Sequence, residues 1–141
     1  MAEQAGKSAA GARAQYRNIN ITQLALYRLP LAGIVSIFHR VSGALMFLVG
    51  LPFMLYLFQQ SITSEISFDA YKLLVSGWFV KLVLLVMIWA YLHHFCAGIR
   101  FLLLDMHIGL EKEASRTSAA IVAGVSLVLT AVVALKLFGA L

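Results

Sequence analysis

Four chemically distinctive residues lie close together at the end of one apolar stretch: His94, Gly98, Arg100 and Asp105. Ionisable side chains inside a stretch long enough to cross a bilayer are costly, so they usually serve a function. Gly98 lies one helical turn beyond His94, on the same face of a helix. An imidazole beside a missing side chain can accept a large flat ring whose metal binds the nitrogen. The pattern is therefore typical of a helix that binds haem.

A second polar cluster lies in an earlier apolar stretch, within residues 36–43. Ser36, Arg40, Gly43 and Phe47 recur at helical spacing, so they share one face of a helix. If one span crosses the membrane upward and the next returns, both clusters fall in the same half of the bilayer. We therefore expect the two clusters to form one polar pocket.

Two histidines follow one another at positions 93 and 94, and they cannot both face one ligand. Neighbouring residues of a helix point about 100° apart. One of the pair is therefore expected to pack or to hydrogen-bond within the bundle. The position of Gly98 favours His94 as the metal ligand and His93 as the packing residue.

Each of the other polar residues also has a purely structural interpretation. Arg40 and Arg100 could extend to the membrane surface, or Arg100 could pair with Asp105 at a helix end. Gly43 could serve close helix packing. Ser36 could donate to the backbone carbonyl one turn earlier.

These residues must be held by membrane-spanning helices. Of the 141 residues, 62% are hydrophobic and 12% are charged, and the mean hydropathy is +0.90. About 20 apolar residues cross a bilayer, and three stretches reach that length, at about 31–58, 76–104 and 119–138. We predict an all-α membrane protein with three transmembrane helices in a single domain, residues 21–141. Its amphipathic segment 21–30 would lie along the membrane surface, and residues 1–20 would form a flexible cytoplasmic tail.

Lysine and arginine residues gather on one side of the predicted spans, which sets the orientation. That side carries Lys7, Arg13, Arg17, Arg28, Arg40, Arg100, Lys112 and Arg116, and the other carries only Lys72, Lys81 and Lys136. The N-terminus is therefore expected in the cytoplasm of a bacterium, with the inner membrane as the location. A mitochondrial inner membrane, with the N-terminus in the matrix, is the alternative. The net charge of +5 follows from this orientation signal and does not indicate a nucleic-acid partner.

Cys96 is the only cysteine, and no Cys-x-x-Cys-His motif is present. Neither an internal disulfide nor covalent c-type haem attachment is then possible. Any haem must be held by ligation and packing.

The two motifs together, Ser36-x-x-His39-Arg40-x-Ser42-Gly43 and His94-x3-Gly98-Ile99-Arg100-x4-Asp105, resemble the cytochrome b membrane subunit of succinate dehydrogenase, respiratory complex II. The resemblance covers roughly residues 17–138, including the order of the motifs and the three-span layout. Three positions depart from the family pattern. Asn18 follows Arg17 where a proline is frequent, Phe101 replaces a histidine, and His107 replaces a glycine.

The resemblance implies a subunit for electron transport in the tricarboxylic acid cycle. It implies one haem b, with His94 as the axial iron ligand, His39 and Arg40 beside the haem propionates, and Gly98 packing against the ring. Ser36 and Arg40 would contact ubiquinone. The implied partners are a flavoprotein subunit, an iron–sulfur subunit and a second small membrane subunit in a larger helical bundle, which would supply the second haem ligand.

Two alternatives remain open at this point. An internal His39–His94 pair could bind the iron from both sides. Alternatively, the chain could be a helical anchor or assembly protein whose polar groups pair with each other and bind no cofactor. In either case the chain would not oxidise succinate by itself, because it has no dinucleotide-binding fold and no cysteines for a cluster.

Overall fold

The computed structural model describes residues 20–139, and this part of the chain is helical throughout, with no strand. Three helical stretches are long and apolar enough to cross a membrane: Leu31–Thr63, Trp78–Asp105 and Lys112–Leu137. The predicted all-α membrane fold with three spans is therefore confirmed. The tail predicted over residues 1–20 lies outside the described residues, apart from Asn20.

The first span is one long rod made of α2 (Leu31–Leu45), a π-helical turn η1 (Met46–Gly50) and α3 (Leu51–Thr63). The wide turn lies next to a proline. The Leu51 N–H donates to the Met46 carbonyl five residues earlier, and Pro52, which follows, has no N–H to donate to the Leu48 carbonyl. At about 1.5 Å per residue the rod is roughly 50 Å long, whereas the hydrocarbon core is about 30 Å thick. The rod is therefore longer than a straight crossing needs, and it must tilt or extend beyond the hydrocarbon core.

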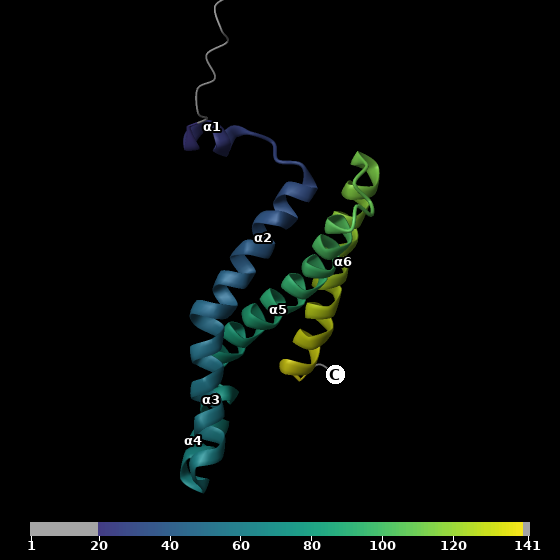
Figure 1. Cartoon of the computed structure of the whole chain (residues 1–141). Coiled ribbons are helices and arrows are strands. Elements are labelled where there is room, and N and C mark those ends of the chain that lie inside the picture. Colours follow the sequence, from purple (N-terminus) through teal and green to yellow (C-terminus); the bar gives the residue numbers. More distant parts are fainter. Residues whose placement is uncertain (1–19, 140–141) are drawn as a thin grey trace, which may run out of the picture.

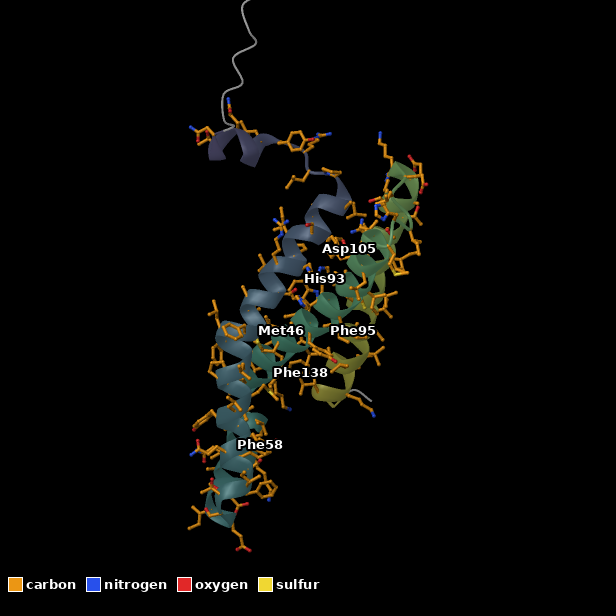
Figure 2. The ribbon with its side chains drawn as sticks, viewed as in Figure 1. Met46, Phe58, His93, Phe95, Asp105 and Phe138 are labelled. Carbon is orange, nitrogen blue, oxygen red and sulfur yellow. The ribbon has the colours of Figure 1, made fainter. Side chains whose placement is uncertain are left out.

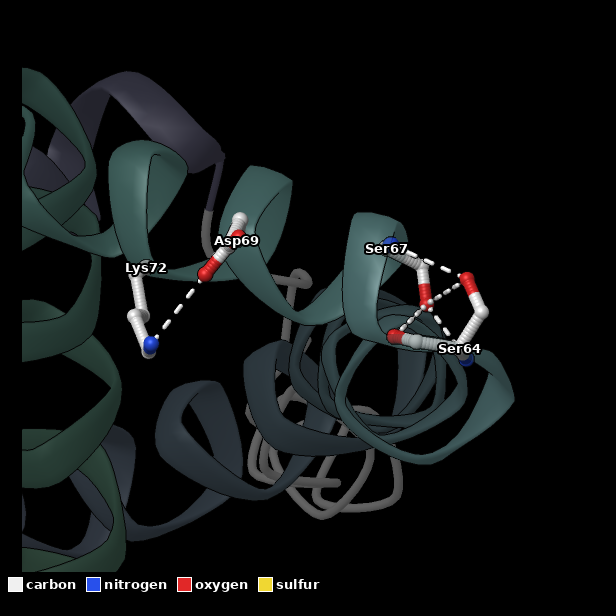
Figure 3. A network of polar contacts seen from close by, with 4 residues as sticks. All are labelled: Ser64, Ser67, Asp69 and Lys72. Atoms are coloured by element: carbon white, nitrogen blue, oxygen red, sulfur yellow. Dashed lines mark hydrogen bonds and ion pairs between the residues drawn. The ribbon is translucent and has the colours of Figure 1, made fainter.

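The first span was predicted to end at about residue 58, but helix continues beyond it, on both sides of Ser64. Ser64 is extended and caps α4 (Glu65–Ser76). Its hydroxyl accepts from the Ser67 N–H at 3.1 Å, and the Ser67 hydroxyl accepts from the Ser64 N–H at 2.9 Å (Figure 3). This reciprocal capping satisfies two backbone donors that a helix start leaves unpaired. The polar residues here start a new helix instead of forming a loop.

The second span is α5 (Trp78–Asp105) and the third is α6 (Lys112–Leu137). The sequence predicted that the third span begins at about residue 119. The helix in fact begins at Lys112, because its charged first turns lie at the end of the bundle, where water can solvate them. The turn between the helices is short, with positive φ at His107 (63°) and Gly109 (77°).

Helix α5 is the central element, since it packs against both α2 and α6. Ala97 of α5 and Ala119 of α6 are fully buried with Val35 and Val122 in the core cluster. Small residues at such positions let membrane helices approach closely. Figure 1 shows α5 running between the rod of α2 and α3 and the yellow α6.

The two ends of the bundle are distinct. The start of α2, the end of α5 and the start of α6 lie at one end, and α3 and α4 extend beyond the end of α6 at the other (Figure 1). Trp78 and Phe138, with ring centroids 4.8 Å apart, join the start of α5 to the end of α6. Helix α1 (Ile21–Leu26) lies crosswise to α2 at the first end.

Candidate functional site

The adjacent histidines of α5 meet different neighbouring helices. His93 is 3% exposed and faces α6, where its Nδ1 lies 3.4 Å from the hydroxyl of Ser126. Figure 2 shows it in the middle of the bundle. His94 is half-buried and faces α2. The structure therefore gives His93 the internal hydrogen-bonding role expected of one member of the pair.

The His94 ring is fixed through one of its two nitrogens. Its Nδ1 lies 2.9 Å from the backbone carbonyl of His39 and 3.3 Å from the hydroxyl of Ser42. A carbonyl oxygen only accepts, so Nδ1 carries the proton. The Ser42 hydroxyl donates to the same His39 carbonyl at 3.0 Å. In a neutral imidazole, Nε2 then keeps its lone pair, which is the electron pair that a metal ion needs.

The ring of His39 covers one face of the His94 ring. The two centroids are 4.1 Å apart and the planes differ by 12°, and Phe101 lies 5.0 Å from His39 on a tilted plane. Two axial ligands of one iron lie on opposite sides of the metal, with their nitrogens directed at each other. Rings stacked face to face do not have that geometry, so this arrangement does not provide an internal pair of ligands.

Two glycines lie where α2 and α5 approach each other, and they differ in how much space a side chain would have. A Cβ on Gly43 would lie 2.8 Å from Cε1 of His94, so no larger residue fits without displacement. A Cβ on Gly98 would lie 3.8 Å from Nε2 of His39, an ordinary contact. Gly43 is therefore required by the position of His94, whereas Gly98 leaves room beside His39.

Ser36 and Arg40 lie one turn apart in the first half of α2. Ser36 is half-buried and Arg40 is exposed. Within residues 20–139 neither side chain makes a hydrogen bond or ion pair, and Ser36 does not bond to the carbonyl one turn earlier. Both groups are available to a ligand at this face.

Arg100 belongs to a different contact from the one that the sequence suggested. It is 5% exposed, so it does not extend to the membrane surface. Its Nε donates to the Ser118 hydroxyl at 3.0 Å, and its Nη2 donates to the hydroxyl and carbonyl of Ser115 at 2.9 and 3.2 Å. In the described part of the chain Asp105 takes no part in an ion pair with it. Arg100 therefore ties α5 to the start of α6.

Two fully buried serines contact the histidines: Ser42 lies beside His94 and Ser126 beside His93. Ser42 belongs to the first motif, but its position there did not indicate a contact with His94. Ser126 was not singled out, because it is an isolated hydroxyl in an apolar helix. Each serine lies near its histidine only because of how the helices pack.

Taken together, α2 and α5 present one imidazole with an available lone pair, a second imidazole beside it and an unpaired guanidinium and hydroxyl. This set can bind a metal in a flat macrocycle, acidic groups on its edge, and a polar ring with carbonyl oxygens. The face is apolar elsewhere, as a membrane requires.

The sequence is similar to those of known proteins. The profile of the succinate dehydrogenase/fumarate reductase transmembrane subunit family matches residues 14–133. The chain is 35% identical over 102 residues to the succinate dehydrogenase cytochrome b556 subunit of Paracoccus denitrificans, covering 72% of this chain and 78% of that protein. It is also 35% identical over 103 residues to the subunit of the same name from Coxiella burnetii, covering 72% and 79%. The chain therefore belongs to the succinate dehydrogenase/fumarate reductase transmembrane subunit family.

Proposed function

We propose that this chain is the cytochrome b anchor subunit of a succinate dehydrogenase complex, and that Nε2 of His94 binds the iron of a b-type haem. The observation that carries the proposal is the 2.9 Å hydrogen bond from Nδ1 of His94 to the His39 carbonyl. Metal-binding histidines usually donate their other ring N–H to such an acceptor, which fixes the tautomer and the ring direction. The name cytochrome b556 of both relatives supports a haem.

The neighbouring residues fit the other parts of a haem. The exposed guanidinium of Arg40 can hold a propionate through two parallel hydrogen bonds, and His39 can donate to the second. Gly98 has no side chain, so it leaves space on the surface of α5 beside His94. When bound, the haem would supply a one-electron redox centre. The role of the chain is to hold it by one imidazole and to pair its acidic groups.

Ser36 and Arg40 are proposed to bind ubiquinone at the cytoplasmic end of α2. The Ser36 hydroxyl can donate to a quinone carbonyl. Reduction to ubiquinol takes up two electrons and two protons, and negative charge develops on the quinone oxygens as the electrons arrive. The Arg40 guanidinium can stabilise that charge, which is the general logic of electrostatic catalysis.

The partners follow from the subunit's chemistry. Electrons would come from an iron–sulfur subunit, which receives them from a flavoprotein subunit that oxidises succinate. A second small membrane subunit would supply the other iron ligand, since His39 is stacked on His94. Exposed apolar side chains near the site, among them Phe47 at 70% and Phe95 at 57%, can pack against that subunit or lipid. We place the complex in a bacterial inner membrane, with the N-terminus in the cytoplasm.

A visible spectrum of the purified complex tests this proposal. We expect a Soret band and the spectrum of low-spin haem b in the wild type. His94→Ala should abolish the low-spin spectrum, and added imidazole should restore part of it by filling the vacant coordination position. A wild-type complex without a Soret band would instead identify a cofactor-free anchor. An unchanged spectrum in His94→Ala would exclude this residue as the ligand.

A further inference from the structure

His93 joins three helices at one buried point. Its ring stacks on Trp89 of α5, with centroids 5.5 Å apart, and meets Phe38 of α2 edge-on at 6.0 Å. Its Nδ1 reaches Ser126 of α6. Its Nε2 is buried with no hydrogen-bond partner among the described residues. A buried nitrogen without a partner is unfavourable, so apolar packing alone, which a phenylalanine would supply better, does not explain a histidine here.

The hydrogen bond between His93 and Ser126 forms with either tautomer of the ring. A protonated Nδ1 donates to the hydroxyl oxygen, and an unprotonated Nδ1 accepts the hydroxyl proton. The Ser126 hydroxyl also lies 3.1 Å from the Ala123 carbonyl of its own helix. At 3.4 Å the bond is long, but it is directional, whereas the ring contacts with Phe38 and Trp89 are not. This bond therefore specifies the rotation of α5 about its own axis at His93.

A rotation of α5 about its axis would move the His94 ring, and the neighbours of that ring leave little space for such a movement. His94 leaves the helix about 100° from His93. On its α2 side the ring lies so close to Gly43 that a Cβ there would be 2.8 Å from Cε1. Rotation in one direction would press the ring into α2, and rotation in the other would lengthen the bond from Nδ1 to the His39 carbonyl.

We infer that His93 is a positioning residue for the haem ligand: through its bond to Ser126 and its packing on Phe38, it sets the rotation of α5 and so the direction in which Nε2 of His94 meets the iron. The inference rests on the proposed role of His94 as that ligand. A residue with this role changes the properties of the iron without being bound to it.

The decisive variant is Ser126→Ala, which removes the hydroxyl and leaves both histidines in place. In the assembled complex we expect haem content near that of the wild type, but shifted g-values in the electron paramagnetic resonance spectrum of the oxidised haem and a shifted midpoint potential. Ser126→Thr, which keeps the hydroxyl, should restore both. His93→Phe, which keeps a flat ring but has no ring nitrogen, should shift them in the same way as Ser126→Ala.

Thr130→Val is the matched control, because the Thr130 hydroxyl on α6 bonds only to the Ser126 carbonyl of its own helix, at 2.7 Å. It should leave the g-values and the midpoint potential unchanged. Wild-type g-values and potential in Ser126→Ala would overturn the positioning role while leaving ligation by His94 intact. An unchanged spectrum in His94→Ala would instead overturn the proposed function on which this inference depends.

Discussion

The imidazole of His94 is held from one side only. Its hydrogen bonds fall on Nδ1, and one ring face is covered by His39. The side chain is therefore oriented before any ligand arrives, and binding costs less conformational entropy than it would for a mobile histidine. The residue that permits this orientation is Gly43, whose missing side chain leaves space for Cε1.

Gly43→Ala should reduce haem binding. The added methyl group would lie 2.8 Å from Cε1 of His94, so either the ring or the helix must move. Overpacking of this kind costs about 1–3 kcal/mol, and the displaced ring would lose its bond to the His39 carbonyl. We expect a lower haem-to-flavin ratio in the purified complex, measured by a pyridine haemochrome assay. Gly33→Ala is the control, since its Cβ would meet no atom closer than 3.7 Å. Equal haem content in both variants would contradict this reading.

Ser36→Ala and Arg40→Leu should slow quinone reduction. A hydrogen bond from a hydroxyl contributes about 0.5–1.5 kcal/mol, so Ser36→Ala should lower the rate with a soluble ubiquinone analogue by roughly threefold to tenfold. The loss in Arg40→Leu should be larger, because a charge is removed. Succinate oxidation with an artificial acceptor, which bypasses the membrane subunits, should stay near the wild-type rate.

Arg116→Leu is the matched control for Arg40, since Arg116 is also an exposed arginine at the same end of the bundle. It should leave quinone reduction unchanged. If Ser36→Ala and Arg40→Leu both reduce quinone at the wild-type rate, the quinone site lies elsewhere.

At the scale of elements, side-chain hydrogen bonds among the described residues join α5 to α6 at two levels and to α2 at one. The buried Arg100 bonds to Ser115 and Ser118 near the start of α6, and His93 bonds to Ser126 two turns further on. On the other side, His94 bonds to α2. Since α5 carries the proposed iron ligand, the α6 contacts stabilise the site without touching it.

Arg100→Gln should therefore destabilise the subunit more than it changes the haem. Hydrogen bonds to a charged donor are worth about 1.5–3 kcal/mol each, and the shorter amide cannot reach both serines. We expect a lower unfolding temperature of the complex, with the haem spectrum unchanged below it. Arg116→Gln, on the exposed face of α6, should leave the unfolding temperature unaltered. The same temperature in Arg100→Gln would show that the link between α5 and α6 does not limit stability.

Some features of the helices could be predicted from the sequence, and others could not. Hydropathy predicted three spans, and helical spacing separated the faces of His93 and His94. Neither signal could find the helix on both sides of Ser64, because local capping rather than hydropathy starts α4. Nor could they pair Arg100 with serines of α6 instead of Asp105, because that choice depends on which helix packs beside it.

At the scale of the whole molecule, the structure has one end for the site and one end that extends outward. The start of α2 and the turn between α5 and α6 share the first end (Figure 1), and the proposed quinone residues Ser36 and Arg40 belong to the first half of α2. At the opposite end α3 and α4 reach beyond α6. A quinone site must face the subunit that supplies its electrons. The orientation of the chain in the membrane therefore decides whether Ser36 and Arg40 can form that site.

Cysteine labelling measures the orientation of the chain in the membrane. In a Cys96→Ser background, Glu111→Cys would place a thiol in the exposed turn before α6, and Ile66→Cys would place one on α4, where the native side chain is 84% exposed. The excess of lysine and arginine at the first end predicts that it faces the cytoplasm. A membrane-impermeant maleimide added to intact cells should therefore label position 66, and position 111 only after the inner membrane is opened. The reverse pattern would put Ser36 and Arg40 on the far side from a cytoplasmic iron–sulfur subunit, and the quinone assignment would be wrong along with the orientation.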